Sequence, residues 1–169
     1  MYGQWDFIRL PDHINSNINP YMFLSQTAEY ALRAVTCVLL NGESEPVNAR
    51  QLSEKTGVPV HYLSKIMRKL VEAGIIRARK GHHGGFQLDK KPEEICLADV
   101  LHAVGLDLED RPCVFGWAQC RNDDPCPLHP VWVKLKDSFR EWSETITLED
   151  IRRENGELRD LEKWKSPDA

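Results

Sequence analysis

Apolar residues recur at helical spacing in the first part of the chain. Between residues 26 and 40, five of them fall on one side of a helix: Ala31, Ala34, Val35, Val38 and Leu39. Asn41-Gly42 follows directly, and glycine often supplies the left-handed residue that ends a helix. The pattern therefore predicts an amphipathic helix over residues 26–40.

Two shorter helices are predicted next, joined by a tight turn. Asn48 and Gln51 have the spacing of a capping box, which favours a helix over residues 49–56 that ends at Gly57. The following helix covers about residues 60–73, and its apolar face contains Leu63, Ile66, Met67 and Leu70. Two short helices with glycine in the turn between them indicate a helix-turn-helix, whose second helix commonly enters the DNA groove.

A β-hairpin is predicted directly after this motif. Residues 75–79 and 86–88 have the composition of strands, and the glycine-rich segment 80–85 between them reads Lys-Gly-His-His-Gly-Gly. A hairpin with a basic tip that follows a helix-turn-helix is typical of a wing. The adjacent histidines of the tip are only a weak signal for a metal site.

Positive charge is concentrated in this part of the chain. Residues 49–91 contain ten Lys or Arg against three Asp or Glu, an excess of seven positive charges, whereas the whole chain has a net charge of −4. Such asymmetry is typical of a module that binds phosphate, with a solvated charged face as the alternative. The residues we expect to contact DNA are Arg50, His61, Ser64, Lys65, Arg68, Arg77, Arg79, Lys80, His82 and His83.

The second half of the chain predicts a short helix over residues 97–104 and a long helix that begins at Pro130. Bulky residues of the long helix recur in steps of three and four, the spacing of a coiled-coil seam: Trp132, Leu135, Phe139, Trp142 and Ile146. Such a seam packs on the chain's own core or on another subunit. We favour a second copy of the chain, because many DNA-binding proteins are two-fold dimers.

Between these two helices lie three cysteines and a histidine: Cys113, Cys120, Cys126 and His129. Glycine and proline among them predict a loop. Thiolate and imidazole are ligands that zinc, copper(I) and iron–sulfur clusters prefer, and the wide spacing suits a group larger than one ion. The alternative is three buried or free thiols and a surface histidine. Cys37 and Cys96 lie on apolar stretches, and we expect both to be packing thiols.

The predicted elements divide the chain into regions. Residues 1–21 are an extension, 22–92 the DNA-binding region, 93–129 the linker helix with the cysteine loop, 130–151 the dimerisation helix and 152–169 a charged tail. No secretory signal and no apolar run long enough to cross a membrane is present. We therefore expect a cytoplasmic protein with reduced thiols.

Several of these features together resemble the Rrf-two family of bacterial winged-helix regulators, which includes IscR-, NsrR- and CymR-like members. The resemblance rests on the segment 22–34, the helix 60–74, the wing 80–86 and the cysteine loop, and it covers about residues 22–151. It implies a mainly α fold with a small β-hairpin, a homodimer, and binding of double-stranded DNA at a palindromic operator. The expected function is transcriptional regulation, as a repressor, rather than enzymatic activity.

The resemblance also implies an iron–sulfur cluster, 2Fe-2S or 4Fe-4S, that senses redox state, nitric oxide or iron–sulfur status. Its cysteine ligands would be Cys113, Cys120 and Cys126. IscR-like members suggest His129 as the fourth ligand, whereas NsrR-like members suggest Glu29 of the partner subunit. We favour His129 because it shares the loop. The first cysteine gap is one residue longer than in the IscR pattern, which leaves the cluster type open, and the unusual wing tip leaves the operator open.

Two alternatives differ from this hypothesis in chemistry. A regulator of the same fold could use zinc or thiol oxidation instead of a cluster. A cysteine-dependent enzyme, with Cys126 as nucleophile beside His129, is the distant alternative, because no third orienting group or oxyanion loop is recognisable.

Overall fold

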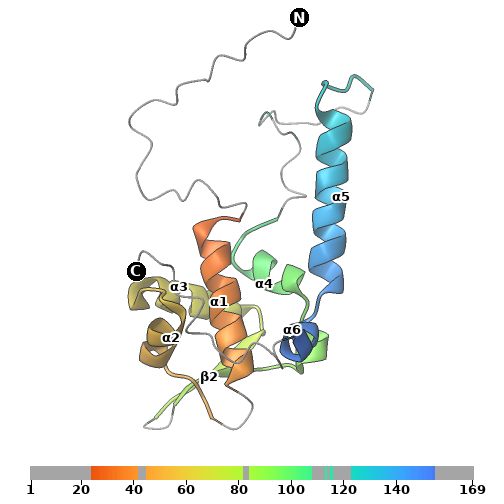
Figure 1. Ribbon diagram of the computed structural model, residues 1–169. Helices are drawn as coiled ribbons and strands as arrows, with labels where there is room; N and C mark the ends of the chain where they lie inside the picture. Colours follow the sequence, from red (N-terminus) through yellow and green to blue (C-terminus); the bar gives the residue numbers. More distant parts are fainter. Residues whose placement is uncertain are drawn as a thin grey trace, which may run out of the picture.

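Helix α1 (Gln26–Leu40) runs through the centre of the protein, as seen in a computed structural model that describes residues 24–41, 45–81, 84–107, 113, 115 and 123–154. It packs against α2 (Ala49–Thr56), α3 (Val60–Glu72), α4 (Leu97–Ala103), α6 (Leu148–Glu154) and β2 (Gly85–Leu88). Together with β1 (Ile76–Arg79), η1 (Pro92–Glu94) and α5 (His129–Thr145), these elements make a mainly α fold with one two-stranded antiparallel sheet (Figure 1). This confirms the predicted fold class.

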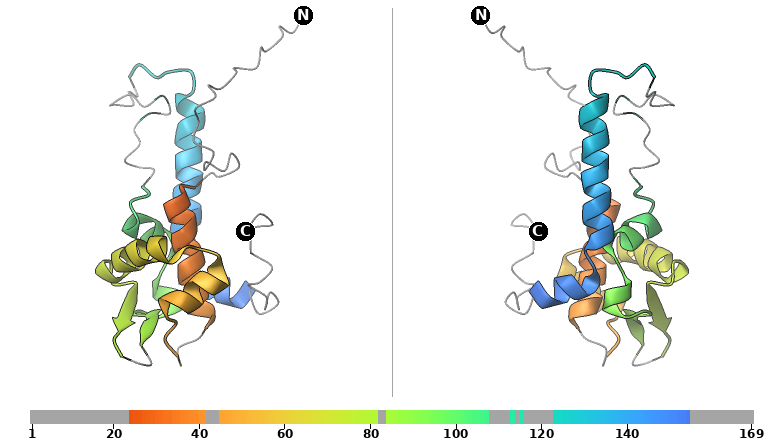
Figure 2. Two further views of the ribbon diagram at one scale, coloured as in Figure 1. Left: turned by 90° about the vertical axis from the view of Figure 1, so that its left-hand side faces the viewer. Right: turned by 90° about the vertical axis from the view of Figure 1, so that its right-hand side faces the viewer.

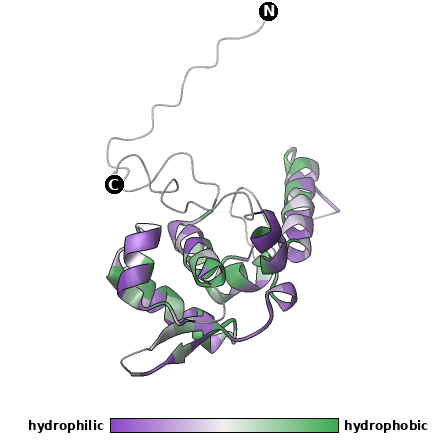
Figure 3. Ribbon diagram, turned by 60° about the horizontal axis from the view of Figure 1, so that its bottom comes forward, coloured by the Kyte–Doolittle hydropathy of each residue, from purple (hydrophilic) through white to green (hydrophobic). Residues whose placement is uncertain are grey.

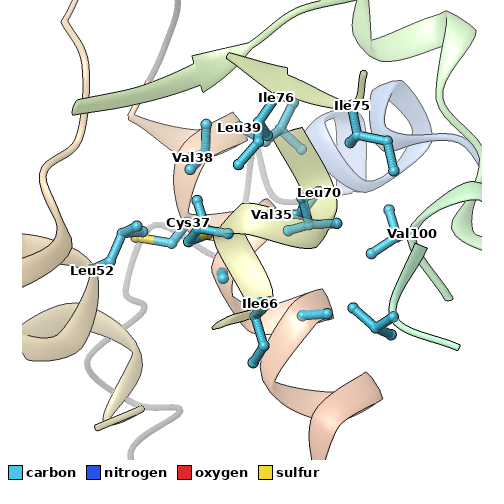
Figure 4. Close-up of a cluster of buried hydrophobic side chains, with 14 of the residues drawn as sticks. Val35, Cys37, Val38, Leu39, Leu52, Ile66, Leu70, Ile75, Ile76 and Val100 are labelled. Carbon is cyan, nitrogen blue, oxygen red and sulfur yellow. The ribbon is translucent and has the colours of Figure 1, made fainter. Parts of the chain in front are cut away.

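The core forms where α1 presents small residues to its neighbours. Ala28, Ala31 and Ala34 are fully buried, which lets the adjacent helices approach closely. Farther along α1, Val35 and Cys37 join Leu52 of α2 and Leu70 of α3 in one apolar cluster (Figure 4). The first helix starts where the sequence predicts, because Ser25 caps it by accepting a hydrogen bond from the backbone N–H of Ala28 at 3.3 Å.

The helix-turn-helix is built from α2 and α3, as the sequence predicts. At the start of α2 the capping box is complete: Gln51 N–H donates to Asn48 Oδ1 at 3.0 Å, and Asn48 N–H donates to Gln51 Oε1 at 2.9 Å. Gly57 adopts a φ of 71°, a left-handed conformation that glycine tolerates and that turns the chain towards α3. Val58 in this turn is fully buried and anchors the turn to the core.

The hairpin pairs Ile76 with Leu88 and Arg79 with Gly85. It starts one residue later than predicted, because Ile75 lies before β1. Val47, just before α2, adds a bridge to the hairpin: Val47 N–H donates to Phe86 O at 3.0 Å, and Phe86 N–H donates to Val47 O at 2.9 Å. Gly85 is required here, since a Cβ at this position would lie 2.7 Å from the backbone of Val47.

Helix α5 ends at Thr145, and Ile146 adopts an extended conformation. The expectation that Ile146 continues the long helix is therefore wrong. The cause is the backbone pairing of this junction with the segment before α4: Leu97 N–H donates to Ile146 O at 3.0 Å, and Leu148 N–H donates to Ile95 O at 2.9 Å. A new helix, α6, then starts at a second cap. There Asp150 accepts from Thr147 N–H at 2.9 Å and from the Thr147 hydroxyl at 2.6 Å, which lowers the pKa of Asp150.

The long helix α5 extends away from the other helices (Figures 1 and 2). Its first turn lies at one end of the molecule, and the β-hairpin lies at the opposite end (Figure 2). Within the described residues, no helix combines the length and the apolar character needed to cross a membrane.

Replacing Leu70 by Ala tests the packing around α1. Leu70 is fully buried in the core (Figure 4), so its truncation should leave a cavity and lower the free energy of unfolding by about 2–5 kcal/mol. Urea denaturation followed by circular dichroism measures this change. Val71→Ala is the control: its side chain is 36% exposed, so we expect a change of about 0.5 kcal/mol or less. Equal stability of the two variants would contradict the packing described here.

Candidate nucleic-acid interface and cysteine loop

The outer face of α3 collects four of the residues expected at DNA. His61, Ser64, Lys65 and Arg68 are all exposed, whereas Leu63, Ile66, Met67 and Leu70 face the core. Hydrophilic residues likewise alternate with hydrophobic ones along the helices of this region (Figure 3). The Ser64 hydroxyl donates to Val60 O at 3.0 Å and keeps its lone pairs available as acceptors.

Tyr62, which was not among the residues expected at DNA, also lies at this surface. Its ring is 41% exposed and stands 4.4 Å from the ring of His61 and 5.7 Å from that of Tyr30, measured between centroids. An exposed aromatic side chain with a hydroxyl can stack and can form hydrogen bonds. The signal was present in the sequence, since position 62 lies outside the apolar stripe of the helix.

Two arginines expected at DNA are held by glutamates of their own helices. Arg50 Nε lies 2.9 Å from Glu54 Oε1 in α2, and Arg68 Nε lies 2.8 Å from Glu72 Oε1 in α3. The hydrogen bond and the charge of Glu72 raise the pKa of Arg68. Both pairs are exposed to solvent, where water screens the attraction.

The basic residues of the hairpin separate into two positions. Arg79 and Lys80 are exposed near its tip. Arg77 lies at its base, where it lines a pocket of about 450 Å³ together with Gln87, Lys90, Lys91 and the last turn of α1. His82 and His83, which we also expect at DNA, lie outside the described residues.

The cysteine loop is described in part. Cys113 is buried, Cys126 and His129 are half-buried, and Cys120 lies outside the described residues. Cys113 and Cys126 are free thiols. The backbone N–H of His129 donates to Cys126 O at 2.9 Å, which ties the last cysteine to the first turn of α5. Among the described residues, which do not include Cys120, no three His, Cys, Asp or Glu side chains form a metal-binding group.

The donors at this loop fit a thiolate-bound group. They are two described thiols and an imidazole, which are ligands suited to iron–sulfur clusters and zinc. Trp132 provides a second indication. It follows His129 by three residues, so both lie on the same side of α5. Its indole Nε1 is buried and has no acceptor among the described residues. A buried donor without an acceptor is costly, and a sulfur atom at the loop would satisfy it.

Glu29, the alternative ligand, is engaged within its own helix. It forms an ion pair with Arg33, and the side chains of the pair are 25% and 29% exposed. The Arg33 guanidinium also lies 6.0 Å from the centroid of the Tyr30 ring. Ligation by Glu29 would therefore require this ion pair to open, whereas His129 already lies at the cysteine loop.

The remaining two cysteines are separate from the loop. Cys37 is fully buried, and its thiol lies 3.5 Å from Asn41 Nδ2. Cys96 stands at the start of α4, with its thiol 3.3 Å from Asp99 Oδ2. Burial raises the pKa of both thiols. A raised pKa keeps a thiol protonated, and the protonated form is a poor metal ligand.

The apolar residues of α5 form two adjacent stripes. Phe139 and the nearby Ile146 pack against the core of their own chain. A second stripe, with steps of three, four and seven residues, is exposed to solvent: Leu128 (44%), Val131 (67%), Leu135 (41%) and Trp142 (41%). We refer to these four residues as the exposed stripe. Leu135 and Trp142 were predicted from the sequence as seam residues. Leu128 and Val131 were not, although they continue the same heptad-like spacing.

Comparisons with known proteins agree with this architecture. Residues 24–154 match the family described as "Rrf2: Iron-dependent Transcriptional regulator". The HTH-type transcriptional regulator IscR of Cronobacter sakazakii is 31% identical over 130 residues, which cover 77% of this chain and 80% of that protein. IscR of Vibrio atlanticus is 28% identical over 134 residues, which cover 79% of this chain and 77% of that protein.

Two solved structures share the fold. T. potens IscR superimposes with a TM-score of 0.67 at 23% identity and covers 82% of this chain and 91% of its own. CymR, the global cysteine regulator of B. subtilis, superimposes with a TM-score of 0.65 at 20% identity and covers 77% of this chain and 95% of its own.

Proposed function

This chain belongs to the Rrf2 family of transcriptional regulators, and we propose that it is a homodimeric repressor that senses redox or iron–sulfur status through its cysteine loop. The observation that supports the proposal is the combination of a helix-turn-helix and wing with thiols that precede the first turn of α5. The family consists of regulators rather than enzymes, so we abandon the alternative of a cysteine-dependent enzyme.

DNA binding would use α3 and the hairpin. The exposed side chains of His61, Ser64, Lys65 and Arg68 supply donors to a groove, and guanidinium groups suit guanine edges and phosphates. Arg79 and Lys80 would contact the backbone beside that groove. The predicted partner is double-stranded DNA with a palindromic operator, since a two-fold protein reads two related half-sites.

Dimerisation would bury the exposed stripe of α5. A helix that extends from the body with large apolar residues on its solvent side is stabilised when another copy covers them. Leu135 and Trp142 belong both to the seam inferred from the sequence and to the exposed stripe. We therefore centre the interface on them and include Trp132, Phe139 and Ile146 only where they border it.

The sensing group would be an iron–sulfur cluster bound by Cys113, Cys120 and Cys126, with His129 as fourth ligand. Bound there, a cluster supplies one-electron redox chemistry. The protein's part is to hold the loop in one position relative to α5: Cys126 is hydrogen-bonded to the first turn of that helix through His129, and the Trp132 N–H is available to a sulfur acceptor.

The described contacts connect α5, which follows this loop, to the elements expected to bind DNA. The segment directly after the C-terminal end of α5 is joined by backbone hydrogen bonds to residues 95–97. Helix α6, which follows α5, contacts both α1 and η1, and η1 follows the hairpin directly. A shift of α5 in the dimer would therefore change the spacing of the two winged helices. A coupling free energy of about 1–3 kcal/mol is sufficient for regulation.

Substitution of the two arginines tests the DNA-binding part of the proposal. Arg68→Ala and Arg79→Ala should each weaken DNA binding, by about 1–3 kcal/mol where the side chain contacts a base edge. Where it contacts phosphate, the slope of log affinity against log salt should fall by about one. Fluorescence anisotropy at several salt concentrations measures both effects. Arg140→Ala on α5 is the control for loss of one positive charge. DNA binding that is unchanged in both test variants would exclude this interface.

Trp142→Glu tests the dimer. Burying an unpaired carboxylate in the interface would cost several kcal/mol, so the variant should sediment as a folded monomer or aggregate, and it should lose affinity for the palindromic site. Trp142→Phe, which keeps an apolar ring, should remain dimeric. Analytical ultracentrifugation distinguishes these outcomes, and a well-folded Trp142→Glu dimer would place the interface elsewhere.

Cysteine substitution tests the cluster. Protein purified without oxygen should absorb visible light and contain iron and sulfide. Each of Cys113→Ala, Cys120→Ala and Cys126→Ala should remove the absorbance, because three thiolates act as a set, whereas the controls Cys37→Ala and Cys96→Ala should keep it. His129→Ala should alter the spectrum, and Glu29→Ala should not. Iron and sulfide at background in the wild type would instead support regulation by zinc or by thiol oxidation.

A further inference from the structure

The acidic residues of the basic region are placed next to its arginines. Residues 49–91 contain only three acids, and two of them, Glu54 and Glu72, each follow an arginine expected at DNA by four residues. Residues four apart lie on the same side of a helix. The carboxylates are 2.9 Å from Arg50 Nε and 2.8 Å from Arg68 Nε. Both acids therefore lie on the surface that we expect to face DNA.

These ion pairs contribute little to the stability of the fold. The side chains of Arg50 and Glu54 are 87% and 62% exposed, and those of Arg68 and Glu72 are 80% and 60% exposed. Exposed pairs are weak because water screens them, and arginine before glutamate is the less favourable order along a helix. DNA can therefore replace either carboxylate when it offers a better acceptor.

Three other cations on this surface differ from these two arginines in that they are not paired with a described carboxylate. Lys65, Arg79 and Lys80 form no ion pair with any described residue. They are available to any phosphate, and such contacts supply affinity without sequence preference. Arg50 and Arg68, in contrast, are each held by a carboxylate through Nε, which offsets their charge and restricts where their remaining N–H groups can point. The two classes of cation should therefore respond differently to random DNA and to the operator.

We propose that Glu54 and Glu72 are positioning residues that determine specificity by withholding Arg50 and Arg68 from loosely placed phosphates. A phosphate out of register meets a guanidinium whose charge is offset by the carboxylate, so it gains little from the contact. An acceptor in register, such as the paired O6 and N7 atoms of guanine or a phosphate fixed by neighbouring contacts, replaces the carboxylate with geometry of equal quality. The glutamates thus lower the affinity for random DNA more than the affinity for the operator. This inference rests on the proposed DNA-binding function.

Glu72→Gln provides the test, because it removes the charge and keeps the size of the side chain. The probes are a duplex selected from a randomised pool by the wild-type protein and a duplex of random sequence. Affinity of Glu72→Gln for the random duplex should rise about two- to fivefold, and affinity for the selected duplex should change less. The salt slope on random DNA should become steeper by about one, since the released arginine contacts a phosphate.

Two comparisons distinguish release of the arginine from a general change in charge. Glu93→Gln in η1 removes the same charge outside α2 and α3 and should leave the ratio of the two affinities unchanged. In an Arg68→Ala background, Glu72→Gln should have no effect beyond that of Glu93→Gln. Equal effects of Glu72→Gln and Glu93→Gln, or an undiminished effect of Glu72→Gln without Arg68, would overturn the inference. If Arg68→Ala binds DNA as tightly as the wild type and the affinity does not depend on salt, the DNA-binding function itself is contradicted.

Discussion

Burial of α1 is the constraint on which the rest of the structure depends. Its small residues are fully buried and allow α2, α3, α4 and α6 to approach one central helix. Because α3 is fixed against α1 through Leu63, Ile66, Met67 and Leu70, its polar side must face outwards. The exposure of His61, Lys65 and Arg68 therefore follows from packing of the opposite face.

The same core fixes the direction in which α5 leaves the body. Backbone hydrogen bonds join Ile146 and Leu148 to Leu97 and Ile95, so the C-terminal end of α5 is held at the core, and the helix extends from there towards His129 (Figure 1). This arrangement places the first turn of α5 and the hairpin at opposite ends of the described structure (Figure 2). In the proposed mechanism, a signal at the loop would act through the position of the whole helix, and the partner subunit of the proposed dimer would follow that displacement.

The elements with local signals were predictable from sequence. Asn48 with Gln51 marks the start of α2, Gly57 marks its end, and the period of Leu63, Ile66 and Leu70 identifies the inner face of α3; the structure confirms each of these. The further helical turn after Ile146 also has a local signal, since Thr147 and Asp150 have the spacing of a cap and form one. The departure of Ile146 itself from the long helix has no such signal, because it results from pairing with residues 95–97, which are distant in sequence. The ion pairs of Arg50 and Arg68 lie between these cases: their spacing is visible in the sequence, but charge counting treats all basic residues as equally available.

The long helix shows why periodicity alone does not identify which apolar side of a helix would face a second subunit. Trp132 and Phe139 lie seven residues apart on one side of α5, and the exposed stripe on the adjacent side has steps of three, four and seven residues, so both sides fit the period of a seam. Periodicity identifies apolar sides, but the partner of each side is set by where α4 lies. Since α4 packs against the side that includes Phe139, the side of Val131, Leu135 and Trp142 is left exposed. Packing of α4 on α5 therefore determines which apolar side of the helix stays exposed, and that side is the one that the proposed dimer would cover.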